Sequence, residues 1–228
     1  MLVQVGRMGW SNIGDRMPKR NRVTPFGEII ATPERGLFMG NRGMLHDDEG
    51  RIKRPWLLKR WIVCELEFRG RKREVMSPGR YTELFFLDEA TAFAAGHRPC
   101  AECRRADFNA YCFYFANAKN SRHFPYAEFL DEKLHRERLT REDQKRTFPA
   151  LLDELPDSVF VTLPDREEQA YLVWGKHLLA WSPGGYRKRI LRPKELKVRV
   201  LTPRTTVKVI QAGYDPAIHD SAMPFRPL

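Results

Sequence analysis

The clearest alternation of apolar and polar positions in this chain lies in residues 61–68. Apolar side chains occupy every second position from 62 to 68, and glutamates lie among the positions between them. A period of two predicts a strand with one buried face. Turn-forming residues after this strand predict two further short strands, at 73–76 and 81–87.

The apolar period changes to that of a helix after residue 87. Asp88 is a good N-cap and Gly96 a good C-terminal residue for a short alanine-rich helix over 89–95. A longer helix is predicted for 104–118, because its apolar residues recur at helical spacing. Further helices are predicted for 126–139, for a segment capped by Thr140 with Asp143, and for 150–155 with Pro149 at its first position.

The last third of the chain returns to strands. They are predicted at 159–163, 170–174, 177–181 and 197–201, with a hairpin turn at Gly175-Lys176. A closing helix is predicted to follow, with Thr202 as its cap, Pro203 as its first residue and Gly213 at its end. This order indicates an α+β fold. We expect a small antiparallel sheet with a zinc-knuckle-like CxxC turn and helices, followed by a C-terminal strand cluster with a closing helix.

The domain organisation follows from length and patterning. The chain has 228 residues, enough for one large domain or two small ones. Residues 1–16 are weakly patterned and are predicted to be a flexible tail or the product of a mis-chosen start, since Met17 would itself be a plausible start. Residues 17–228 are predicted to form one α+β domain, with a possible division into a metal-containing half at 17–120 and a helical and strand half at 121–228.

The distribution of positive charge along the chain indicates which kind of partner it binds. The net charge of +11 is divided unevenly, with +7 in residues 1–76, 0 in 77–120, −4 in 121–170 and +8 in 171–228. Two basic ends favour DNA or RNA as a partner. No apolar run is long enough for a membrane span, and four cysteines without a secretory signal fit a reducing compartment, so we expect a cytoplasmic protein.

Clustered cations are the candidates for phosphate contacts. The predicted nucleic-acid-binding residues are Arg71, Lys72, Arg73, Arg98, Arg104, Arg105, Arg187, Lys188 and Arg189.

The sharpest local motif is the CxxC pair of Cys100 and Cys103. A turn of this spacing can direct two thiolates at one zinc ion. Cys64 and His46 are the candidates for the remaining ligands. Cys112 shares an apolar helix face and is interpreted as a core residue.

Residues 89–105, EATAFAAGHRPCAECRR, resemble the second half of the metal-binding module of Ada-type methylphosphotriester repair proteins. Similar short zinc modules are appended to some bacterial nucleases. The resemblance implies that Cys100 and Cys103 bind zinc within a small sheet flanked by helices. The upstream CxxxC pair of the Ada module is absent, so its four-cysteine site and methyl-accepting chemistry are not implied. The segments GNRGMLHD and YTELFFLDEATA are similar to segments of bacterial proteins of comparable size, which implies no activity.

Three classes of function remain open. The first class, a zinc-containing nucleic-acid-binding protein with one zinc per chain, accounts for both the CxxC motif and the basic charge. A metal-dependent enzyme acting on nucleic acid or nucleotides would draw on weak catalytic candidates, His97, Glu102, Asp131, His135 and Glu137. The deaminase pattern lacks its first half, because Leu66 and Asp48 stand where a glutamate is needed. A structural protein with an acidic protein partner is the third class. The first class is our prediction.

Overall fold

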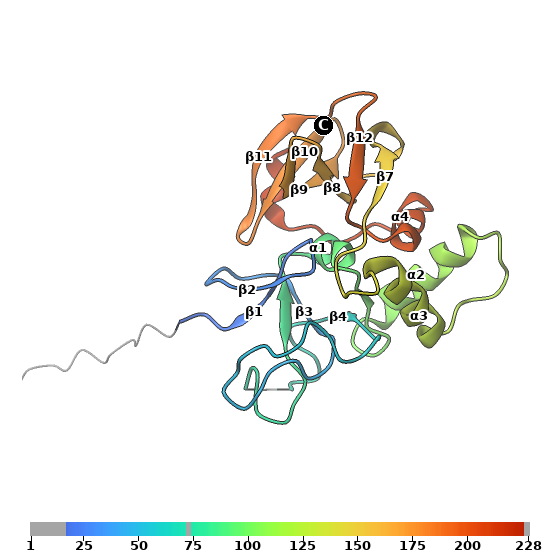
Figure 1. The fold of residues 1–228 in the computed structure, drawn as a ribbon. Coiled ribbons are helices and arrows are strands. Elements are labelled where there is room, and N and C mark those ends of the chain that lie inside the picture. The colour runs from blue at the N-terminus through green and yellow to red at the C-terminus, as the bar shows by residue number, and fades with distance from the viewer. Residues whose placement is uncertain (1–16, 72–73, 226–228) are drawn as a thin grey trace, which may run out of the picture.

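The fold consists of two six-stranded sheets with helices between and beside them (Figure 1). The structure, a computed structural model, describes residues 17–71 and 74–225. Both sheets are mostly antiparallel. The expected α+β class is therefore confirmed, whereas the prediction for residues 1–16 lies outside the described residues.

The first sheet has the strand order β2-β1-β5-β3-β4-β6. Two of its pairings are parallel, β1 with β5 and β4 with β6. The second of these joins the predicted strand of 61–68 to the CxxC segment. The strands are β1 (Arg20–Val23), β2 (Ile29–Ala31), β3 (Phe38–Asn41), β4 (Ile62–Cys64), β5 (Leu84–Phe86) and β6 (Arg98–Pro99).

The second sheet has the order β11-β10-β9-β8-β12-β7. The predicted hairpin is confirmed, since His177 pairs with Trp174 across the two-residue turn. The strands are β7 (Phe148–Leu151), β8 (Phe160–Leu163), β9 (Arg166–Trp174), β10 (His177–Ser182), β11 (Gly185–Leu191) and β12 (Lys197–Val200).

Three predicted helices are confirmed close to their expected bounds, and the closing helix is confirmed within 203–213. They are α1 (Glu89–Ala94), α2 (Arg105–Asn117), α3 (Ala127–Arg138) and α4 (Arg204–Gln211). Asp88 caps α1 by accepting a hydrogen bond from the Thr91 backbone N–H at 2.8 Å. Gly96 follows with φ +99°, a left-handed conformation that favours glycine.

Helix α1 lies between the two sheets and contacts β5 of the first and β8 of the second (Figure 1). Its N-terminus holds two buried carboxylates. Asp88 accepts a hydrogen bond from the Tyr186 hydroxyl of β11 at 2.6 Å. Glu89 accepts from the Tyr214 hydroxyl at 2.9 Å and from the Ala217 N–H. These bonds tie α1 to the C-terminal part of the chain.

In three segments the structure differs from the helices and caps that local sequence propensity predicts. Residues 150–155 are not a helix, because Phe148–Leu151 pairs with β12 as strand β7, and only Leu152–Glu154 form a 3₁₀ turn. The segment after Thr140 is a turn closed by a bridge between Leu139 and Lys145. Thr202 does not cap α4, because its hydroxyl accepts the Phe160 N–H of the neighbouring strand instead.

The strand of 61–68 is shorter than its alternation predicts. Only Ile62–Cys64 finds partners, in β3 and β6. Residues 74–76 form no strand, and Arg73 lies outside the described residues. Within 17–71 and 74–225, no helix has both the length and the apolar character needed to cross a membrane.

Candidate metal centre

Parallel pairing of β4 with β6 brings distant cysteines together. Val63 pairs with Pro99, and the Cys100 N–H donates to the Val63 carbonyl at 2.9 Å. Cys64 and Cys100 each follow one residue of this pair, so they lie side by side at the ends of two adjacent strands. Cys103 follows in the turn before α2. Strand pairing supplies a third sulfur to the CxxC motif.

The three sulfurs of Cys64, Cys100 and Cys103 all lie within 4.8 Å of one another. Three thiolates bound to one zinc ion at about 2.3 Å would lie roughly 3.8 Å from one another, which falls within this limit. The Glu102 N–H donates to the Cys100 sulfur at 3.4 Å, so the turn already points a backbone dipole at this ligand. The donor set and spacing fit a thiolate-binding metal such as zinc.

The thiols perturb one another. Hydrogen bonds from Cys103 and Cys64 lower the pKa of Cys100, and the bond to Cys100 raises the pKa of the other two thiols, aided by burial. Holding three thiolates so close requires a cation between them.

The predicted ligand His46 does not join the sulfurs, and neither does the fourth cysteine, Cys112. His46 is buried, but its ring nitrogens lie 2.6 Å from the Thr82 hydroxyl oxygen and 3.2 Å from the Ser77 carbonyl oxygen. The prediction of His46 as a ligand is corrected, since these contacts hold the ring outside the cluster. Cys112 is buried on α2, as interpreted, with its sulfur beside the Pro125 carbonyl.

Carboxylates near the cluster are held by arginines. Glu65 follows Cys64 and lies 3.2 Å from Arg104 Nε. Glu102, exposed within the turn, pairs with Arg71 at 2.8 Å. Among the residues that the structure describes, the metal-ligand group comprises the three cysteines alone. A tetrahedral metal held by these three cysteines would have one position for a further ligand.

Two predicted phosphate contacts are corrected by burial. Arg98 is 1% exposed and forms a two-bond ion pair with Asp131 at 2.9 and 2.8 Å. Arg104 is buried against Glu89 at 2.6 Å. Neither guanidinium can reach a phosphate. Arg71 and Arg105 are exposed beside the cluster, whereas Lys72 and Arg73 lie outside the described residues.

The basic run on β11 is exposed but is not one patch. Adjacent strand residues point to opposite faces, which separates Lys188 from Arg189. Arg189 lies over the Phe225 ring, and Arg187 lies 3.7 Å from Glu34. The run therefore presents its charges in different directions.

The predicted catalytic candidates are engaged in structural contacts. Asp131 is the partner of Arg98. His135 contacts the Trp56 ring, and Glu137 bonds the first turn of α4. His97 is fully buried, and burial lowers its pKa well below the usual value, so the ring is neutral.

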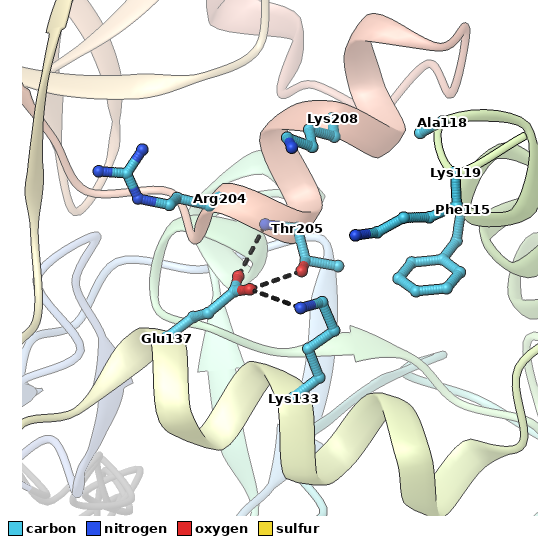
Figure 2. A pocket seen from close by; sticks show the side chains of 8 residues that line it. All are labelled: Phe115, Ala118, Lys119, Lys133, Glu137, Arg204, Thr205 and Lys208. Carbon is cyan, nitrogen blue, oxygen red and sulfur yellow. Dashed lines mark hydrogen bonds and ion pairs between the residues drawn. The ribbon is translucent and has the colours of Figure 1, made fainter.

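A cationic pocket of about 200 Å³ lies between α2, α3 and α4 (Figure 2). Glu137 is its one carboxylate, and this group already binds the Thr205 N–H and hydroxyl at 2.7 Å and Lys133 at 3.3 Å. Sequence clustering missed the pocket because its cations come from separate segments. They are Lys119, Lys133, Arg204 and Lys208.

Comparisons of the chain with protein-family models, with curated proteins and with solved structures find no match.

Proposed function

We propose that this chain is a zinc-containing nucleic-acid-binding protein. The convergence of Cys64, Cys100 and Cys103 within 4.8 Å carries the metal part of the proposal. One Zn²⁺ per chain would join β4, β6 and the start of α2, although Cys64 and Cys100 lie 36 positions apart in the sequence. Thiolate ligands favour zinc over magnesium or calcium.

Exposed cations support the nucleic-acid part. Lys119 and Lys208 flank the helical pocket and form no ion pair within the described residues. Arg204 lies over the Phe148 ring at 3.8 Å, which leaves its edge free to donate. Cations around a concave surface suit a phosphate backbone, and counterion release makes such binding salt-dependent.

The three-ligand centre also favours a second candidate, a metal-dependent hydrolase. A fourth position open to water is typical of catalytic zinc. Cys103 is the least buried of the three cysteines, so the cluster is not sealed from solvent at this residue. Hydrolysis of a nucleic acid or nucleotide by the zinc-loaded protein, lost in Cys64→Ala, would favour this second candidate.

A salt series tests the nucleic-acid proposal. Binding of fluorescent single-stranded DNA, duplex DNA and RNA is measured by anisotropy at increasing NaCl. The double variant Lys119→Gln, Lys208→Gln should flatten the slope of log affinity against log salt by about 2 for duplex DNA, because two phosphate contacts are lost.

The matched control is Arg51→Gln, Lys53→Gln, which removes the same charge from cations already paired with Asp47. This control should leave the slope nearly unchanged. Absence of salt-dependent binding to every probe, or equal flattening by both variants, would contradict the proposal.

A further inference from the structure

The exposed aromatic side chains of this protein are gathered in one segment. Among the residues that the structure describes, every largely exposed phenylalanine, tyrosine or tryptophan lies between positions 113 and 129. They are Phe113, Phe124, Tyr126 and Phe129, on α2, on α3 and in the loop between these helices. Large apolar side chains gathered at a surface are typical of a site where another molecule binds.

Phe129 connects this surface to the cationic pocket between α2, α3 and α4. Its ring meets the ring of Phe115, which lines the pocket, at a centroid distance of 6.1 Å and an interplanar angle of 76°. Phe129 also precedes Lys133, another lining residue, by about one turn of α3, so these two side chains share a face of the helix. The exposed ring of Phe129 therefore borders the pocket.

The Phe129 ring is open to solvent on its outer side. Its contact with Phe115 is edge-to-face, an arrangement that covers at most one face of one ring. Phe129 is 53% exposed, whereas Phe115 is buried. A planar group can therefore stack on Phe129 while Phe115 supports the ring from inside the protein.

The charges beside the ring indicate the chemistry of the ligand. Four cations and one carboxylate line the pocket, and this carboxylate, Glu137, is already bound by Thr205 and Lys133. The charges of Lys119 and Lys208 are therefore not balanced within the pocket, and Figure 2 shows Lys119 extending toward Thr205. An apolar peptide would leave these cations without a counter-charge. A second copy of this chain, itself at +11, is disfavoured by its charge.

We propose that this surface binds single-stranded nucleic acid, with one base stacked on Phe129 and the adjoining phosphates held by Lys119 and Lys208. The inference rests on the proposed nucleic-acid-binding function and specifies the form of the nucleic acid. In a duplex the bases are stacked on one another and present only their edges in the grooves, so a duplex can use the lysines but not the ring. A single strand can use both.

Removal of the bases separates stacking from charge. Fluorescence anisotropy at fixed salt compares oligothymidylate, oligouridylate and an abasic oligonucleotide of equal length, which keeps the phosphates. The wild type should bind the better of the two base-bearing strands about tenfold more tightly than the abasic strand. The stronger of these two ligands assigns DNA or RNA. Phe129→Leu, which keeps an apolar contact with Phe115, should remove the tenfold difference, and Phe129→Tyr should restore it.

Phe113→Leu is the matched control. Phe113 is similarly exposed, but it lies two residues from Phe115 on α2 and thus points in a nearly opposite direction. This variant should keep the tenfold difference. Equal binding of the abasic and base-bearing strands by the wild type, or equal losses in Phe129→Leu and Phe113→Leu, would overturn the proposal.

Sedimentation of the free protein covers the remaining occupant of the surface. A dimer that Phe129→Leu dissociates, with strand binding unchanged, would show that a second copy covers the ring and would also overturn the proposal. Salt-dependent binding that is equal for all strands contradicts this inference and leaves the proposed function standing. Absence of binding to every probe contradicts both.

Discussion

At the scale of single residues, residue type and spacing predicted the cluster of three cysteines, but they did not predict the surroundings of the cations. Cys64, Cys100 and Cys103 were all predicted, because a thiol has few roles besides core packing and metal binding. Arg98 and Arg104 were assigned to phosphate, but both are buried against carboxylates. An arginine in a sequence carries no sign of whether its charge faces solvent or an internal partner.

Lys145 gives a residue-scale prediction for pH. Its pKa of about 7 in the folded protein lies below the ordinary lysine value of 10.5, so the unfolded chain binds the extra proton between these limits. Folding stability should therefore rise with pH from about 7 to 10 through this group. Urea unfolding at several pH values should show a steeper rise for the wild type than for Lys145→Met, and parallel curves would contradict the assignment.

At the scale of elements, strand pairing determined secondary structure that local sequence patterns did not predict. Residues 150–155 have a helix-like start at Pro149, yet β12 recruits 148–151 as a strand. Helix α1 was predictable because its cap residues are local, Asp88 before it and Gly96 after it. The short strand β6 carries no alternation, so its parallel pairing with β4 could not be read from the sequence.

The cap of α1 predicts an unusually large loss of stability. Asp88→Ala removes the acceptor for the buried Thr91 N–H and Tyr186 hydroxyl and for the half-buried His219 N–H. We expect a loss of about 3 kcal/mol in urea unfolding, against about 1 kcal/mol for an ordinary cap. Asp157→Ala removes a surface turn bond to Gly175 and is the control. Equal losses for both variants would show that the Asp88 network does not join the two sheets.

At the scale of the whole molecule, segment charges do not translate into surfaces. The helical pocket draws cations from a neutral segment, an acidic segment and the basic C-terminal segment (Figure 2). Several cations of the basic ends are buried or paired instead. Net charge therefore predicted a class of partner, but the place where it would bind required the fold.

A metal ion in the cysteine cluster would link segments that lie far apart in the chain. Zinc content per chain is measured by plasma mass spectrometry on purified wild type, Cys64→Ala and Cys112→Ala. We predict one zinc per chain in the wild type and in Cys112→Ala, and little in Cys64→Ala. Cys64 belongs to the cluster of three cysteines, whereas Cys112 does not. Wild-type protein without zinc, or Cys64→Ala with a full zinc ion per chain, would contradict the central claim.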